Sequence, residues 1–187
     1  DESVYSEKEN ISIRLVQPNI KQEEKWKKSL REKHFQKLVY LSTYDNNNFK
    51  PKYIIWPESA FEFNLEKNQH ENINLFNWLE KGQLLITGST RVVNNVESQS
   101  QIYNSVFVIN NNGKIINYYD KVKLVPFGEF IPLRKLLNFK KITMGSLDFS
   151  SGINSNILAF EKGKLKMGLL ICYEIIFPEK VINGERP

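Results

Sequence analysis

Apolar runs predict three strands in the first half of the chain. Residues 11–16 alternate apolar and polar side chains before Pro18, which is the pattern of a half-buried strand that ends in a turn. Residues 53–56 and 84–87 are short apolar runs, and Pro57 closes the first of them. Runs of this length, bounded by turn residues, are typical of buried strands.

Two pairs of strands in the second half are predicted to be hairpins. Residues 103–109 and 114–119 flank the Asn-Asn-Asn-Gly sequence at 110–113, which favours a tight turn. Residues 157–160 and 164–171 flank a Lys-Gly pair in the same way.

Helical spacing of side chains occurs in three places. Residues 23–42 predict a long helix, because apolar side chains recur every three or four positions. Residues 73–81 predict a short helix that Gly82 ends, and residues 175–182 predict another. The stripe on the long helix consists of Trp26, Leu30, His34, Phe35, Leu38 and Val39.

The order of these elements predicts an α/β fold. Strands alternate with helices early and pair as hairpins later, which indicates a mixed sheet that is buried on at least one face. No internal repeat or linker divides the chain, so we expect a polar N-terminal segment at 1–10 and one domain at 11–187. A content of 41% hydrophobic and 25% charged residues over 187 residues is sufficient for a sizeable core.

The charge of the chain favours anionic partners only weakly. Its 26 Lys and Arg residues against 21 Asp and Glu give a net charge of +5, spread along the sequence. The sequence has no nucleic-acid-binding motif and no cluster of His and Cys ligands, so we expect no nucleic-acid partner and no metal. No apolar run reaches the roughly 18 residues that span a bilayer, so this sequence is expected to be soluble or peripheral.

The single cysteine, Cys172, is a candidate nucleophile. It follows the apolar run 167–171 and precedes a predicted helix. A side chain at such a turn is exposed at the end of the sheet, and the amide-rich start of the helix favours a thiolate. The alternative is a core cysteine that ends a buried strand, and position alone favours that alternative.

A nucleophilic thiol needs a base, and Glu58 is the best candidate. It follows the predicted strand 53–56 and Pro57, at the end of the sheet where α/β folds place their sites. His34 lies on the stripe of the long helix and His70 lies in a polar stretch, so neither ends a strand. The competing interpretation of Glu58 is a surface residue that caps a helix after a proline turn.

Lys121 lies where the predicted strand 114–119 leaves the sheet. An ammonium group at this position could stabilise a thiolate and an oxyanion, although a solvated lysine at a strand end is the commoner case. The Val-Pro-Phe-Gly-Glu sequence at 125–129 follows it. This sequence combines a proline, a glycine and an aromatic residue with Glu129, which indicates a loop under geometric constraint.

Three short motifs occur in the order Glu, Lys, Cys. Trp-Pro-Glu ends at Glu58, Tyr-Asp-Lys ends at Lys121, and Cys-Tyr-Glu begins at Cys172. In this order they resemble the nitrilase superfamily, whose members use a Glu-Lys-Cys triad.

Three longer segments resemble one branch of that superfamily, the apolipoprotein N-acyltransferases. They are residues 123–132, which contain Val-Pro-Phe-Gly-Glu, residues 172–178, and residues 17–20 with Trp26 downstream. The resemblance extends from about residue 11 to the end of the chain.

The resemblance implies a nitrilase-like α-β-β-α sandwich with mixed sheets, truncated here after the nucleophile strand. It implies that Cys172 attacks the acyl ester of a phospholipid, that Glu58 moves the proton, and that Lys121 holds the oxyanion. The thioester then passes its acyl chain to the N-terminal diacylglyceryl-cysteine of a lipoprotein. No cofactor is implied.

Supporting roles are implied for four more residues. Glu129 orients the lysine or supports the intermediate, Tyr173 and Glu174 shape the pocket, and Trp26 controls substrate access. The resemblance also implies an enzyme of the bacterial inner membrane whose domain lies on the periplasmic face, at the membrane surface. Residues 132–144 interleave apolar and basic side chains, which suits a lipid headgroup boundary or, equally, a helix packed on the core.

Two other functions stay open. One is a soluble carbon–nitrogen hydrolase with the same triad that acts on amides or nitriles, although the loop at 125–129 argues against it. The other is an inactive truncated remnant, because the sequence ends at Pro187 before further strands that the resemblance implies.

Overall fold

A computed structural model shows a mixed five-stranded sheet within residues 11–44, 48–60, 74–94, 100–131, 148–153, 155–160 and 165–177, which are the residues that the structure describes. Its strands lie in the order β1 (Ile13–Leu15), β2 (Tyr53–Ile55), β3 (Leu84–Val93), β4 (Gln101–Asn110) and β5 (Ile115–Asp120). The first three strands are parallel, and the last three are antiparallel. The predicted mixed α/β fold is confirmed.

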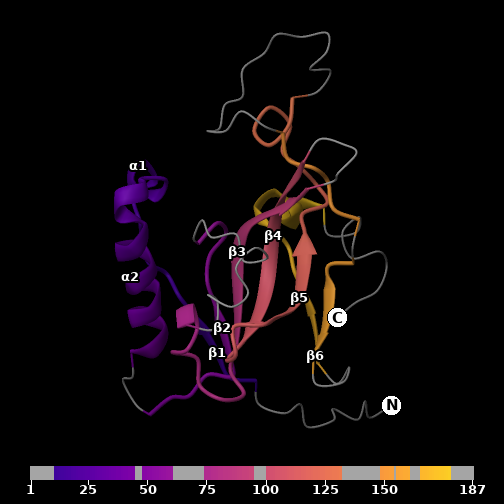
Figure 1. Cartoon of the computed structure of the whole chain (residues 1–187). Coiled ribbons are helices and arrows are strands. Elements are labelled where there is room, and N and C mark those ends of the chain that lie inside the picture. Colours follow the sequence, from indigo (N-terminus) through magenta and orange to yellow (C-terminus); the bar gives the residue numbers. More distant parts are fainter. Residues whose placement is uncertain are drawn as a thin grey trace, which may run out of the picture.

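The sheet lies between a helix and a hairpin (Figure 1). Helix α2 (Arg31–Thr43) covers one face, where its buried residues Phe35 and Leu38 join the core. Strands β6 (Ile157–Phe160) and β7 (Leu165–Gly168) form the hairpin, which packs on the other face. The hairpin contributes Leu158 and Phe160 to a second core cluster with Tyr53, Ile86 and Val108.

Trp56 anchors the helix side of the core at the end of β2. Its ring stacks on Trp78 with centroids 5.6 Å apart and meets Phe35 edge to face at 5.8 Å. Its indole Nε1 donates to Ser42 Oγ (2.7 Å), and Ser42 Oγ donates to the Leu38 carbonyl (2.7 Å). The buried polar atoms of Trp56 and Ser42 are therefore paired, whereas the buried Nε1 of Trp78 has no hydrogen-bond partner among the described residues.

The prediction of one helix over residues 23–42 is wrong. The structure has α1 (Gln22–Lys25), the 3₁₀ helix η1 (Lys28–Leu30) and then α2. Lys27 has ψ of 113°, which no helix can continue through. Trp26, the first residue of the predicted stripe, is 37% exposed, because the core contacts of this region are made further along, in α2.

Other element boundaries also differ from the prediction. Of the predicted helix 73–81, residues 74–75 are helical and turns follow, and Gly82 has the expected positive φ of 88°. Strand β7 ends at Gly168, three residues before the predicted end, and the 3₁₀ helix η3 (Cys172–Ile176) begins at the cysteine itself. Residues 178–182 of the third predicted helix, like residues 132–144 and His70, lie outside the described residues.

Strands β3 and β4 are longer than the apolar pattern predicts. They pair over ten residues each, and the polar half of β3 from Gly88 to Arg91 is as regular as its apolar half. In the part of the chain that the structure describes, no helix is long and apolar enough to cross a membrane.

Candidate active site

Glu58 lies in a turn that β3 holds in close contact. Trp56 N donates to the Ile86 carbonyl (2.9 Å), and Ala60 N donates to the Gly88 carbonyl (3.0 Å). A Cβ atom at Gly88 would lie 2.7 Å from Glu58 Cα, so only glycine allows the turn to approach this strand. Ser59 follows with a positive φ of 49°, which directs the chain back over the sheet.

Asn104 on β4 links the Glu58 carboxylate to a second carboxylate. Its Nδ2 donates to Glu58 Oε1 (2.7 Å) and to Glu129 Oε1 (3.0 Å). Lys121 Nζ forms an ion pair with Glu129, at 2.9 Å from each of its oxygens. Glu58, Asn104, Glu129 and Lys121 are therefore one hydrogen-bonded network, which we call the carboxylate cluster.

Lys121 is 1% exposed, and its backbone is held on both sides. Its N–H donates to the Asn104 carbonyl (2.9 Å), and its carbonyl accepts from Gly152 N (2.8 Å). A side chain at Gly152 would overlap the carbonyl of Asp120. This packing fixes where the lysine leaves β5.

Asp120 anchors the end of β5 from the opposite face of the sheet. Its Oδ1 accepts from Arg91 Nε (2.9 Å) and from Ser105 Oγ (2.6 Å), and the carboxylate is almost fully buried. The Arg91 guanidinium also lies over the rings of Tyr103 and Tyr118, at 4.5 and 4.7 Å from their centroids. Adjacent residues on a strand point to opposite faces. Because Asp120 is anchored on one face, the side chain of Lys121 is directed to the other face, where Glu129 lies.

Glu129 is presented by a tight loop between β5 and the next segment. Its backbone N donates to the Val125 carbonyl (2.8 Å), and its Oε2 accepts from Val125 N (2.9 Å). Phe127 has a positive φ of 62°, and its N–H donates to the Phe130 carbonyl (2.7 Å). The geometric constraint that the sequence predicts for residues 125–129 is therefore present.

Cys172 lies in a strained turn and lines the same cavity as Glu58. It has a positive φ of 51°, which is unfavourable for a residue with a side chain, and its side chain is exposed. The cavity has a volume of about 270 Å³. Glu58, Asn104, Ser105 and Cys172 are polar residues of its lining, and the apolar ones include Ile55, Ile86, Val106 and Leu169.

Glu174 connects the Cys172 turn to the segment after Lys121 through hydrogen bonds. Its Oε1 accepts from Tyr119 OH (2.8 Å), Val122 N (2.7 Å) and Lys123 N (2.9 Å), and its Oε2 accepts from Ile171 N (2.9 Å). It has no exposed surface. Burial and the Glu174 carboxylate raise the pKa of Tyr119 well above its ordinary value, so this phenol stays a hydrogen-bond donor.

Of the predicted site residues, only Glu58 and Cys172 line the cavity of about 270 Å³, and its lining does not include Lys121, Glu129, Glu174, Tyr173 or Trp26. Tyr173 is 36% exposed and packs against Phe177, with ring centroids 5.2 Å apart. Trp26 lies under Lys25, whose Nζ is 5.4 Å from its ring centroid and donates to the backbone carbonyl of Glu58 (3.3 Å). Lys25 therefore links the Trp26 ring to the backbone of the Glu58 turn.

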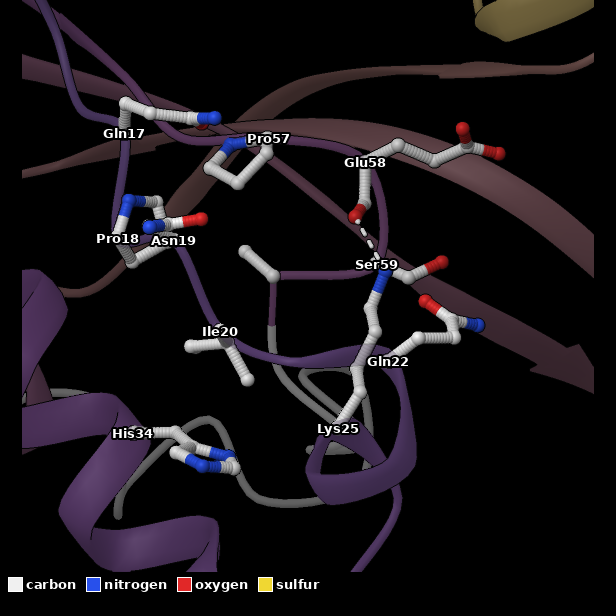
Figure 2. Close-up of a pocket in the computed structure, with 11 residues that line it drawn as sticks. Gln17, Pro18, Asn19, Ile20, Gln22, Lys25, His34, Pro57, Glu58 and Ser59 are labelled. Carbon is white, nitrogen blue, oxygen red and sulfur yellow. Dashed lines mark hydrogen bonds between the residues drawn. The ribbon is translucent and has the colours of Figure 1, made fainter.

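A second cavity, of about 180 Å³, lies on the other side of the Glu58 turn (Figure 2). Its lining includes Asn19, Lys25 and His34. Figure 2 shows the Glu58 carboxylate turned away from these residues. His34 thus lines a different cavity from Cys172.

Sequence reasoning missed Asn104 and Gly88. Both lie inside long strands, where the sequence gives no turn or strand end to mark them. A polar residue inside a strand at a position facing the core is the one signal that could have singled out Asn104. Among the described residues, no group of three His, Cys, Asp or Glu side chains is placed to hold a metal ion.

Residues 12–184 match the model of the carbon-nitrogen hydrolase family, and the chain belongs to this family. Its relatives include the apolipoprotein N-acyltransferase of Brucella suis biovar 1 (strain 1330), 32% identical over 185 residues, and that of Rhizobium leguminosarum bv. trifolii (strain WSM2304), 38% identical over 178 residues. These alignments cover 96% and 91% of this chain but 35% and 33% of the relatives. The chain therefore spans about a third of their length.

Two solved structures share the nitrilase-like fold. The NitN amidase from Neterenkonia sp. AN1 has a TM-score of 0.53 at 18% identity, and the match covers 91% of this chain and 60% of that one. The glutamine-dependent NAD+ synthetase from Acinetobacter baumannii has a TM-score of 0.50 at 20% identity, covering 81% of this chain and 27% of that one. At these identities the likeness establishes the fold alone.

Proposed function

We propose that this chain is the catalytic part of an apolipoprotein N-acyltransferase, with Cys172 as nucleophile, Glu58 as base and Lys121 as oxyanion stabiliser. The observation that carries the proposal is that Cys172 and Glu58 line one cavity. Glu58 is linked through Asn104 and Glu129 to Lys121. The names of the relatives supply the reaction class.

The first half-reaction forms a thioester. Cys172 Sγ attacks the ester carbonyl carbon of a phospholipid while Glu58 takes the thiol proton. Lys121 stabilises the developing oxyanion, since a positioned cation acts most strongly where charge develops. The C–O bond then breaks, Glu58 returns the proton to the leaving oxygen, and a lysophospholipid departs.

The second half-reaction transfers the acyl chain. The α-amino group of a diacylglyceryl-cysteine attacks the thioester carbon, and Glu58 takes a proton from the amine. The C–S bond breaks, the new amide bond remains, and the sulfur of Cys172 regains its proton. The apolar residues of the cavity lining, which include Ile55, Ile86, Val106 and Leu169, are suited to contact the first carbons of an acyl chain.

The supporting residues take roles that their contacts favour. Glu129 orients Lys121, Glu174 fixes the nucleophile turn, and Trp26 with Lys25 borders the Glu58 turn. With these proposed substrates, we expect the whole protein to lie at the bacterial inner membrane, with this domain on the periplasmic face. Its donor is a phospholipid, and its acceptor is a lipoprotein.

The test is an acyl-transfer assay in detergent micelles with phosphatidylethanolamine carrying a labelled acyl chain and a diacylglyceryl lipopeptide. We expect label on Cys172 before the acceptor is added and label on the lipopeptide amine afterwards. Cys172→Ala should give neither, and Cys172→Ser should give no labelled thioester. Labelled lipopeptide from Cys172→Ala would overturn the proposal.

Hydrolysis of a simple amide is the second candidate, because the chain belongs to the carbon-nitrogen hydrolase family and shares its fold with an amidase. The same preparation should release no acid from a short amide if the acyltransferase assignment is right. Release of acid that requires Cys172, without lipopeptide acylation, would favour the amidase. A folded protein whose Cys172 resists iodoacetamide would favour an inactive remnant.

A further inference from the structure

Asn104 occupies a singular position in the carboxylate cluster, because one nitrogen atom serves two carboxylates. Its Nδ2 carries two hydrogens, and both are used, one for Glu58 Oε1 and one for Glu129 Oε1. Its backbone carbonyl accepts from Lys121 N, and the residue is only 6% exposed. A single residue inside β4 therefore contacts the candidate base, its neighbouring carboxylate and the candidate oxyanion stabiliser.

The two carboxylates of the cluster are balanced differently. Glu129 is paired with the buried ammonium of Lys121. No cation pairs with the Glu58 carboxylate among the residues that the structure describes, since Lys25 bonds only to its backbone carbonyl. A neutral amide thus holds Glu58 in place, whereas a full positive charge holds Glu129.

We propose that Asn104 is a positioning residue that orients Glu58 as a proton acceptor and separates it from the ion pair of Glu129 and Lys121. An N–H group cannot accept a proton, so its bond to Oε1 leaves Oε2 of Glu58 to receive the proton of Cys172. This inference rests on the proposed role of Glu58. It adds a residue that the Glu-Lys-Cys motifs do not contain, and it assigns the reacting oxygen.

The first experiment measures the alkylation rate of Cys172 by iodoacetamide from about pH 4 to about pH 9 in the full chain, with peptide mass spectrometry as the readout. Asn104→Asp adds a third carboxyl group beside those of Glu58 and Glu129. Repulsion between like charges should make this cluster retain a proton to higher pH. The pH of half-maximal rate should rise by about one unit or more. Asn117→Asp, a matched change in β5 away from the cluster, should leave it where it is.

The second experiment is a double-mutant cycle with Asn104→Leu, which keeps the approximate shape and removes both donors. We expect this change to slow alkylation at neutral pH about tenfold in the unaltered chain, in line with a misplaced general base. In a Glu58→Gln background it should slow alkylation less than about twofold, because no base remains to position. If Asn104 were merely structural, its replacement would slow alkylation by the same factor in both backgrounds.

Equal losses in the two backgrounds would overturn the inference, as would an unshifted profile in a folded Asn104→Asp protein. The cycle still decides the question if the aspartate variant does not fold. Alkylation needs neither an acyl donor nor an acceptor. An unaltered protein that transfers no acyl chain would therefore remove the proposed function and leave the alkylation result readable.

Discussion

Glu58 and Glu174 are two carboxylates near the same cavity, and their surroundings are opposite. Glu174 is fully buried and accepts four hydrogen bonds, three of them from backbone N–H groups. Glu58 is exposed to the cavity and accepts one side-chain hydrogen bond, from Asn104. A buried carboxylate that is held by four donors can only hold structure, whereas one with a free oxygen facing a cavity can receive a proton.

The two glutamates also divide the work of assembling the site. Glu174 joins the turn of Cys172 to Val122 and Lys123, which directly follow Lys121. The Glu58 turn is joined to the sheet by β3 instead. The nucleophile and the lysine are thus fixed relative to each other by one buried group, and the base approaches them from a separate element.

The largest effect should come from Glu58→Gln. Glutamine keeps the oxygen that Asn104 bonds but cannot take a proton, so acyl transfer should fall about a thousandfold. Because the side chain is exposed, the free energy of unfolding should change by no more than about 0.5 kcal/mol. The assay and a urea titration measure the two quantities, with Glu80→Gln as a surface control. Retained transfer would mean that the base lies elsewhere.

Glu174→Gln should have the opposite result, a large loss of stability with a small loss of acyl transfer. One oxygen becomes an NH₂ group that faces backbone donors, and an unpaired buried donor costs about 3 kcal/mol with the lost charge-assisted bonds. Transfer by the folded fraction should fall only about tenfold, through displacement of the Cys172 turn. Urea unfolding gives the stability. Unchanged stability with abolished transfer would show that Glu174 acts in the chemistry and would break the comparison.

Gly88→Ala tests the Glu58 turn without touching a charged group. The added Cβ lies 2.7 Å from Glu58 Cα and from Ser59 N, so the turn must shift away from β3. Such overpacking should cost about 2 kcal/mol of stability and lower transfer at least about tenfold, because the carboxylate moves with the turn. An active variant of full stability would show that the turn tolerates the shift. Gly82→Ala should also lose stability, because a φ of 88° is strained for a residue with a side chain, but its Cβ meets open space, so transfer by the folded protein should not change.

The sequence predicts one part of this site and misses another for a physical reason. Lys121 follows β5 directly, Glu58 follows the end of β2 by three residues, and Cys172 follows the segment that leaves β7, so local pattern is enough to find them. Asn104 and Gly88 lie within strands, and their importance depends on the register between β3 and β4 and on what packs across it. That register is a long-range property. The broken helix near Trp26 was missed for the same reason, since within residues 22–43 the buried core residues begin at Phe35.

The smallest effect on acyl transfer should come from Tyr119→Phe, which removes one of the four donors to Glu174 and leaves the three backbone donors in place. Loss of a hydrogen bond to a buried charge should cost about 2 kcal/mol at neutral pH, less than Glu174→Gln. The folded state raises the pKa of Tyr119, so its contribution to stability is complete below the ordinary pKa of 10.0. As the pH rises above that value, the unfolded phenol ionises first and this contribution is lost.

Urea titrations at neutral pH and at a pH above 10 measure both parts of the Tyr119 prediction. The unaltered chain should lose stability on going to the higher pH, and Tyr119→Phe should lose less, so the difference between the two proteins narrows. Tyr40→Phe, a change at an exposed tyrosine, should leave the unaltered behaviour intact. A difference in the free energy of unfolding that stays constant across this pH range would mean that the phenol is not held as a donor to Glu174. The contrast between Glu174 and Glu58 would then rest on the three backbone donors to Glu174 alone.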